Sequence, residues 1–146
     1  RAVIPTIISQ LLDHPEFVEL GSLDTSRDLT YVSDTAGGIL AAALGTGGEG
    51  EVYNLGTGDE WSVRDILGRI CELMDLSPEI REDSARVRPR KSEVARLVSD
   101  NRRVRQAFGW EPEFQGAAGL QSGLVETVDW YKKNLDFYSN RSRLLL

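Results

Sequence analysis

The chain has 146 residues, of which 40% are hydrophobic and 27% charged, and its formal net charge is −6 at pH 7. These values are ordinary for one globular domain, and the negative charge argues against a general nucleic-acid or anionic-membrane binder. No apolar run reaches the roughly 18 residues that a membrane-spanning helix needs. We therefore expect a single α/β domain over residues 1–146, with α+β-like character because the predicted strands are short.

The charge is unevenly distributed. Between Arg81 and Arg105 there are nine basic and four acidic residues, although the chain as a whole is acidic. A local basic segment in an acidic protein is consistent with a site for a small anion such as a diphosphate. A solvated, arginine-rich face explains the same pattern equally well.

The first half of the chain alternates between helical and strand-like patterns. In chain order, its predicted elements are a helix at 1–12, a strand at 17–20, a strand at 29–32, a helix at 33–44 and a strand at 51–56. His14-Pro15 ends the first helix, because a residue before proline is disfavoured in the helical region. Ser33 or Asp34 can cap the second helix. Glycines at 56 and 58 predict a turn after the last strand.

The second half is mostly helical. In chain order, its predicted elements are a helix after Ser62, an extended charged stretch from Pro78 to Val87, a short helix ending at Phe108 and a final helix at 117–138. Ser62 caps the first of these helices, and Asp65 partly completes a capping-box pattern. Asp100 or Asn101 caps the short helix, which Gly109 can end in a left-handed conformation.

The chain has one cysteine and one histidine. A single cysteine excludes an internal disulfide, so a reducing, cytoplasmic setting is the natural expectation. The same scarcity argues against a structural zinc site. Cys71 falls on the apolar stripe of its predicted helix and is interpreted as a core residue, whereas His14 is interpreted as a loop residue without a catalytic role.

The sequence contains neither of two motifs typical of redox enzymes in its required setting. The glycines at 45, 47 and 50 match G-x-G-x-x-G, but a dinucleotide loop needs a strand before it and a helix after it. Here a helix precedes the glycines and a strand follows, so we interpret them as a turn. No tyrosine has a lysine four residues later, and no histidine-based nucleophilic triad is present. We therefore identify no catalytic residue in this chain.

Four segments in order, covering nearly the whole chain, resemble the C-terminal half of the extended short-chain dehydrogenase/reductase family, the NAD-dependent epimerases and dehydratases. The segments are RAVIPTIISQLL, LGSLDTSRDLTYVSDTAGGILAA, GEVYNLGTGDEWSVRDI and RPRKSEVARLVSDNRRVRQAFGWEPEF with its closing GLVETVDWY. Each is weakly specific by itself, but their order and spacing make the resemblance strong. Among subfamilies, the pattern is most similar to the GDP-mannose and UDP-N-acetylglucosamine 4,6-dehydratases, followed by the dTDP-glucose 4,6-dehydratases and the UDP-sugar 4-epimerases.

The resemblance implies a site for a nucleotide-diphosphate sugar. Arg27, in the family's arginine-aspartate position, would bind the substrate diphosphate through charge-assisted hydrogen bonds, and Arg88 would do so from the other side. Asn54, at the end of a predicted strand, would contact the nucleotide or hold the turn. Glu19 and Leu20 would line the base and ribose pocket, and Glu93 would contact the ribose.

The resemblance also implies that the Rossmann half is absent. That half would supply the glycine-rich NAD loop and the Tyr-x-x-x-Lys pair, so this chain alone is expected to bind no NAD and to be inactive. The full-length enzyme would use NAD. The surface that faces the missing half should be exposed, and self-association is therefore expected.

Two other functions remain open at this point. The chain is compatible with a stand-alone, non-catalytic module that binds a nucleotide sugar. It is also compatible with an interaction protein that kept the fold and lost the pocket.

Overall fold

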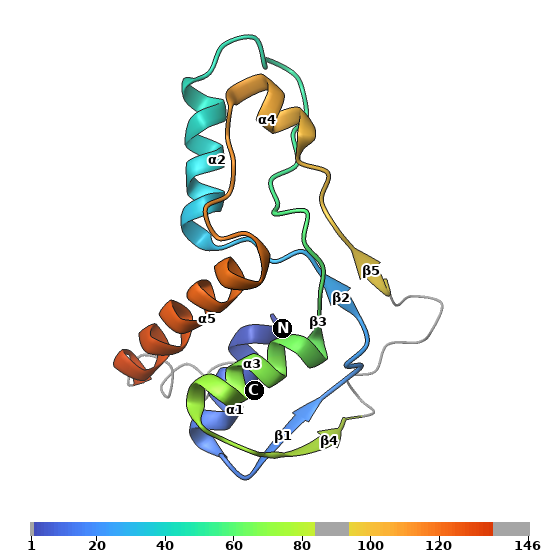
Figure 1. The fold of residues 1–146 in the computed structure, drawn as a ribbon, viewed down its shortest axis with the longest axis vertical. Helices are drawn as coiled ribbons and strands as arrows, with labels where there is room; N and C mark the ends of the chain where they lie inside the picture. The colour runs from blue at the N-terminus through green and yellow to red at the C-terminus, as the bar shows by residue number, and fades with distance from the viewer. Residues whose placement is uncertain (1, 84–93, 136–146) are drawn as a thin grey trace.

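The computed structural model describes residues 2–83 and 94–135. The elements in chain order are α1 (Val3–Asp13), β1 (Phe17–Leu20), β2 (Ser26–Arg27), α2 (Val32–Leu44), β3 (Trp61–Ser62), α3 (Val63–Met74), β4 (Glu79–Glu82), β5 (Arg96–Leu97), α4 (Arg102–Phe108) and α5 (Gly116–Lys133). Figure 1 shows α1, α3 and α5 at one end with β1 and β4, and α2 beside α4 at the other end. This mixture of helices and short strands confirms the α/β class.

One hydrophobic core joins α1, β1, α3 and α5. Each of these elements contributes buried apolar side chains: Ile7, Ile8 and Leu11; Val18 and Leu20; Val63, Ile66, Leu67 and Ile70; Leu120, Leu124, Val128 and Tyr131. Burying one such side chain stabilises the fold by roughly 1.5–3 kcal/mol. Cys71 is partly buried and packs against this core, as the sequence predicted, and burial raises the pKa of its thiol.

The strands form two short sheets. β1 pairs with β4 in parallel, with Phe17 opposite Glu79. In the second sheet, β2 lies in the centre, antiparallel to β3 and parallel to β5. The second sheet therefore brings together three segments that are far apart in the sequence, at the junction between the two ends (Figure 1).

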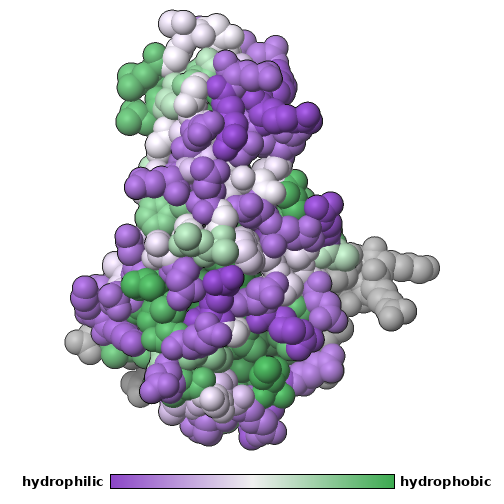
Figure 2. Space-filling view, viewed as in Figure 1, coloured by the Kyte–Doolittle hydropathy of each residue, from purple (hydrophilic) through white to green (hydrophobic). Residues whose placement is uncertain are grey.

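Helix α2 has an exposed apolar side. Val32, Ile39, Leu40 and Leu44 are 58–76% exposed, and the exposed Ala36 and Ala43 complete a stripe at helical spacing. We call these six residues the α2 stripe. Figure 2 shows hydrophobic side chains along this outer edge of the helix, at the upper left. A helix that is apolar on more than one side normally lies inside a larger structure.

Several predicted elements are confirmed. α1 and β1 match the predicted helix and strand, and α5 matches the core of the final helix. The Ser62 hydroxyl accepts the amide of Asp65 at 3.0 Å, and the Asp65 carboxylate accepts the amide of Ser62 at 3.0 Å, so the capping box is complete. Gly109 ends α4 with a φ of 65°, in the left-handed region.

The predicted strand at 29–32 is wrong. The strand lies earlier, at Ser26–Arg27, and α2 already begins at Val32, with the Tyr31 carbonyl accepting the amide of Thr35. The expected cap from Ser33 or Asp34 is wrong too, because Tyr31 occupies the N-cap position without a side-chain bond. The Asp34 carboxylate instead accepts the backbone amides of Glu113 and Phe114, and the Tyr31 ring lies against Phe114 with ring centroids 4.3 Å apart.

The predicted strand at 51–56 is not a strand within the described residues. The segment is not assigned to any ladder, and Val52 is 75% exposed. β-propensity alone does not make a strand, because a ladder needs a neighbouring strand to receive its hydrogen bonds. The cap of α4 is shared: Asn101 occupies the N-cap position, but it is Asp100 that accepts the amide of Arg102.

In the two ranges that the structure describes, no helix is both long enough and apolar enough to cross a membrane.

Candidate functional site

Arg27 lies at the centre of the β3-β2-β5 sheet. It is opposite Trp61 on one side and Leu97 on the other, and its side chain is half-buried. Its Nη1 donates to the Ser26 carbonyl at 2.6 Å. The sheet thus holds a permanent positive charge at the junction of the two ends, with a planar donor group that suits carboxylate or phosphate.

The next residue, Asp28, joins three segments. Its Oδ1 accepts the Thr57 amide at 3.0 Å and the Thr57 hydroxyl at 2.7 Å. Its Oδ2 accepts the amides of Gly58 at 3.0 Å and Ser99 at 3.1 Å. One carboxylate therefore fixes the end of β2, the glycine turn and the chain that leaves β5. The sequence analysis did not single out Asp28, although it directly follows Arg27 in the arginine-aspartate motif.

The glycine turn packs too closely for a side chain at its first position. A Cβ on Gly56 would lie 2.4 Å from Ser99 Cβ and 2.6 Å from Asp28 Oδ2. Gly58 adopts a φ of 81°, which L residues rarely take. The buried Asn101 amide donates to the Gly56 carbonyl at 2.7 Å. Asn54, two residues before Gly56, is exposed.

A second carboxylate links the strands of the same sheet. Glu60 accepts the Ser26 hydroxyl and the Arg96 Nε, both at 2.5 Å. These two hydrogen bonds hold the pKa of Glu60 below its ordinary value. Arg96 therefore adds a second guanidinium to the sheet that carries Arg27, and Glu60 orients it.

The remaining predicted site residues lie elsewhere. Glu19 and Leu20 belong to β1 in the other sheet. Leu20 is only 4% exposed and packs in the hydrophobic core, whereas Glu19 is half-buried and its backbone bonds to the Gln10 side chain. Arg88 and Glu93 lie outside the described residues. The structure thus brings Arg27 and the turn after Asn54 together around Asp28. Glu19 and Leu20 lie in the other sheet.

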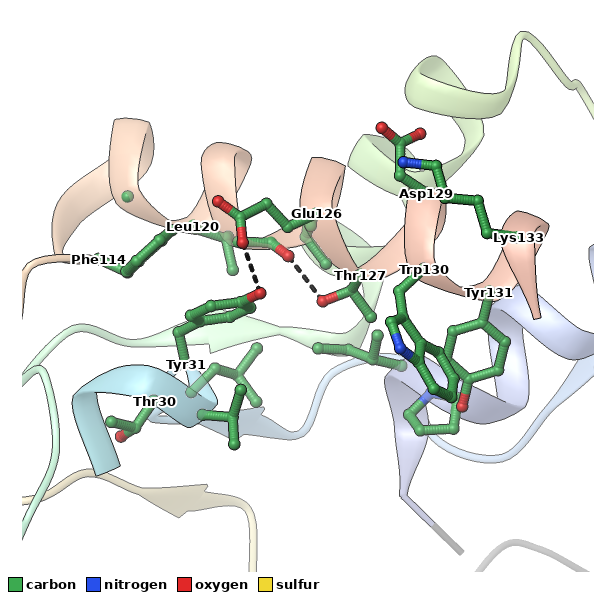
Figure 3. A pocket seen from close by; sticks show the side chains of 17 residues that line it. Thr30, Tyr31, Phe114, Leu120, Glu126, Thr127, Asp129, Trp130, Tyr131 and Lys133 are labelled. Carbon is green, nitrogen blue, oxygen red and sulfur yellow. Dashed lines mark hydrogen bonds between the residues drawn. The ribbon is translucent and has the colours of Figure 1, made fainter. Parts of the chain in front are cut away.

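A groove with a volume of about 840 Å³ lies between α1, residues 29–32 and α5 (Figure 3). Its walls include Tyr31, Phe114, Trp130 and Tyr131, and Figure 3 shows the Tyr31 hydroxyl pointing at Glu126. That hydroxyl donates to Glu126 at 2.7 Å, and this hydrogen bond raises the pKa of Tyr31. A raised pKa keeps the Tyr31 hydroxyl protonated, and its hydrogen bond to Glu126 links the start of α2 to α5.

The glycine loop that follows α2 lacks the surroundings of a dinucleotide-binding loop. The loop with Gly45, Gly47 and Gly50 follows α2 and leads into the extended segment 51–56, so no helix N-terminus faces it. Gly47 and Gly50 take φ values of 83° and 79°, as expected for a turn. No group of three or more His, Cys, Asp or Glu in the described part of the chain is arranged to hold a metal ion.

Comparison with known proteins identifies the family. The family described as GDP-mannose 4,6 dehydratase matches residues 1–122. The chain belongs to this family. The resemblance to the NAD-dependent epimerases and dehydratases is thereby confirmed, and the match corresponds to their C-terminal portion.

Curated relatives include the dTDP-glucose 4,6-dehydratase 1 of Escherichia coli, 31% identical over 94% of this chain and 38% of the relative. A second relative is described as a UDP-glucose 4-epimerase of Methanocaldococcus jannaschii, and it is 30% identical over 90% of this chain and 39% of the relative. The chain therefore spans about two fifths of the length of these relatives.

Solved structures agree on the fold. An epimerase from Methanothermobacter thermautotrophicus has a TM-score of 0.82 at 26% identity, over 96% of this chain and 40% of that chain. The UDP-glucose 4-epimerase of Thermotoga maritima, solved with UDP-glucose, has a TM-score of 0.77 at 28% identity, over 92% of this chain and 40% of that chain.

Proposed function

We propose that this chain is the substrate-recognition portion of an NAD-dependent nucleotide-sugar 4,6-dehydratase or epimerase, and that Arg27 binds the diphosphate of the substrate. The observation that carries the proposal is the position of Arg27, half-buried at the centre of a sheet and one residue before the carboxylate that anchors the glycine turn. Guanidinium groups bind phosphate oxygens through two parallel hydrogen bonds. Relatives that act on nucleotide sugars support the ligand class.

The other site residues take supporting roles in this proposal. Asn54 is exposed beside the anchored turn, and its amide contacts the nucleotide. Glu19 lines the base and ribose side, with Leu20 beneath it as a core residue. Arg88 completes the diphosphate site and Glu93 contacts the ribose; both assignments rest on the family resemblance.

The NAD-binding part of the enzyme is a partner in this proposal. A dTDP-glucose 4,6-dehydratase from Bacillus anthracis, 26% identical, was solved in complex with NAD. Bound NAD would supply the hydride transfer, and in this proposal the NAD-binding part holds it. This chain alone is therefore a recognition unit without turnover. A reducing compartment such as the cytoplasm suits a chain with one cysteine.

The α2 stripe is the surface on which that part docks. Its four large side chains are exposed, and the extended segment 51–56 beside it has no ladder partner among the described residues. In the absence of the NAD-binding part, the stripe of one chain covers that of another. Size-exclusion chromatography with light scattering should show concentration-dependent association that Ile39→Asp abolishes. A wild-type chain that stays monomeric at high concentration would contradict the self-association.

Calorimetric titration tests the recognition function. UDP-glucose, dTDP-glucose and GDP-mannose are titrated separately into the chain, with NAD as the comparison ligand. We expect one nucleotide sugar to bind and Arg27→Ala to weaken it at least tenfold. Arg64→Ala is the matched control, because Arg64 is exposed in α3 and paired with Asp24. Equal affinities of wild type and Arg27→Ala would refute the assignment of Arg27.

A further inference from the structure

We propose that Asp28 is the positioning residue of the diphosphate site, although it does not itself touch the ligand. The inference rests on the proposed function, because it names the residue that sets the distance between Arg27 and the turn after Asn54. Arg27 lies on β2, whereas Asn54 belongs to an extended segment outside any ladder of the described residues. Their relative position must therefore be set by contacts other than sheet pairing.

Asp28 supplies those contacts. Its carboxylate accepts four hydrogen bonds at 2.7–3.1 Å, three from the turn residues Thr57 and Gly58 and one from Ser99. The Asp28 amide in turn donates to the Leu97 carbonyl at 2.9 Å, which continues the pairing of β2 with β5. Asp28 is thus bound rigidly to the strand that carries Arg27, and the turn is bound rigidly to Asp28.

Close packing restricts the conformation and position of the glycine turn. Gly56 approaches Asp28 and Ser99 so closely that no Cβ fits, and Thr57 is 9% exposed. Because Asn101 also holds the Gly56 carbonyl, the turn is fixed from both sides. A small shift of the carboxylate would move the turn as a unit, and with it the segment that presents Asn54.

The four donors also resolve an electrostatic conflict. A carboxylate next to a diphosphate site would repel the ligand if its charge faced outward. Three backbone amides and one hydroxyl direct their positive ends at the Asp28 oxygens, so its charge faces donors of the protein itself. The negative charge of Asp28 therefore faces donors of the protein, whereas the guanidinium of Arg27 attracts an anionic ligand.

The substitution Asp28→Asn tests this role. Asparagine retains one acceptor oxygen, but its NH2 group donates and cannot accept from a backbone amide. The matched control is Asp34→Asn. It removes a carboxylate that also accepts backbone amides, two of them, but at the start of α2 and from other segments. Both variants should be destabilised, so a loss of affinity confined to Asp28→Asn cannot be attributed to lower stability.

Three measurements are made well below the melting temperature. Calorimetry uses the sugar that wild type binds most tightly among UDP-glucose, dTDP-glucose and GDP-mannose. Backbone amide exchange reports on Thr57, Gly58 and Ser99, and the Arg27 Nε–H signal in NMR spectra reports ligand contact. We expect Asp28→Asn to bind at least tenfold more weakly, with faster exchange of the three amides and a smaller ligand-induced shift of the Arg27 signal. Asp34→Asn should match wild type in all three.

The outcomes separate this inference from the proposed function. If wild type binds a nucleotide sugar and Asp28→Asn binds equally well despite faster amide exchange, Asp28 is structural only and the inference is overturned. If wild type binds none of the three sugars, both the proposed function and this inference are refuted. If Asp28→Asn does not fold, Thr57→Val decides: it removes one of the four bonds, and an unchanged affinity would overturn the inference.

Discussion

Replacing Asp34 by asparagine should destabilise the junction between α2 and the segment leading into α5. Asp34 is 6% exposed, and its two carboxylate oxygens accept the amides of Glu113 and Phe114 at 2.9 Å each. A hydrogen bond to a charged group contributes about 1.5–3 kcal/mol. Asparagine keeps one acceptor and turns a donor toward the other amide, so the free energy of unfolding should fall by about 2–3 kcal/mol.

Urea denaturation followed by circular dichroism measures this change directly. In a thermal melt, about 2–4 °C per kcal/mol is typical for a chain of this size, so the midpoint should fall by roughly 4–12 °C. Asp24→Asn is the control, because Asp24 is 85% exposed and its ion pair with Arg64 should contribute little. A loss smaller than about 0.5 kcal/mol for Asp34→Asn would refute the view that its two hydrogen bonds hold the junction together.

Three further predictions concern local features. Ser62→Ala breaks the capping box with Asp65 and should lower the free energy of unfolding by about 1 kcal/mol in urea denaturation, whereas an unchanged midpoint would contradict the capping role. Hydrogen bonds from Arg102 lower the pKa of Asp100 from 3.8 to about 2, so their stabilisation is present above pH 4 and lost as the pH falls toward 2. The urea midpoints of wild type and Asp100→Asn should therefore converge over that range, and a constant difference would count against the pair. Burial raises the pKa of the Cys71 thiol, so a disulfide reagent at pH 8 should react many-fold more slowly with the native chain than in urea; equal rates would mean that the thiol is accessible.

The candidate site was predictable only in part. Arg27 and Asn54 were identified through family motifs, and the structure brings β2 and the turn after Asn54 together. Asp28 stands in the arginine-aspartate motif, but its role was missed because its partners Thr57 and Ser99 are 29 and 71 residues away in the sequence. The groove beside Tyr31 was missed for the same reason, since its walls come from α1, residues 29–32 and α5.

The sequence by itself determined the features that depend on neighbouring residues. The apolar spacing of α1, α3 and α5, the Ser62–Asp65 cap and the left-handed Gly109 follow from helical periodicity and from interactions within one turn of chain. Only the tertiary structure decided where β2 begins, why residues 51–56 form no ladder and what Asp28 and Asp34 bind. Strand pairing and buried carboxylates take their hydrogen-bond partners from distant segments, and only the folded chain brings those partners together.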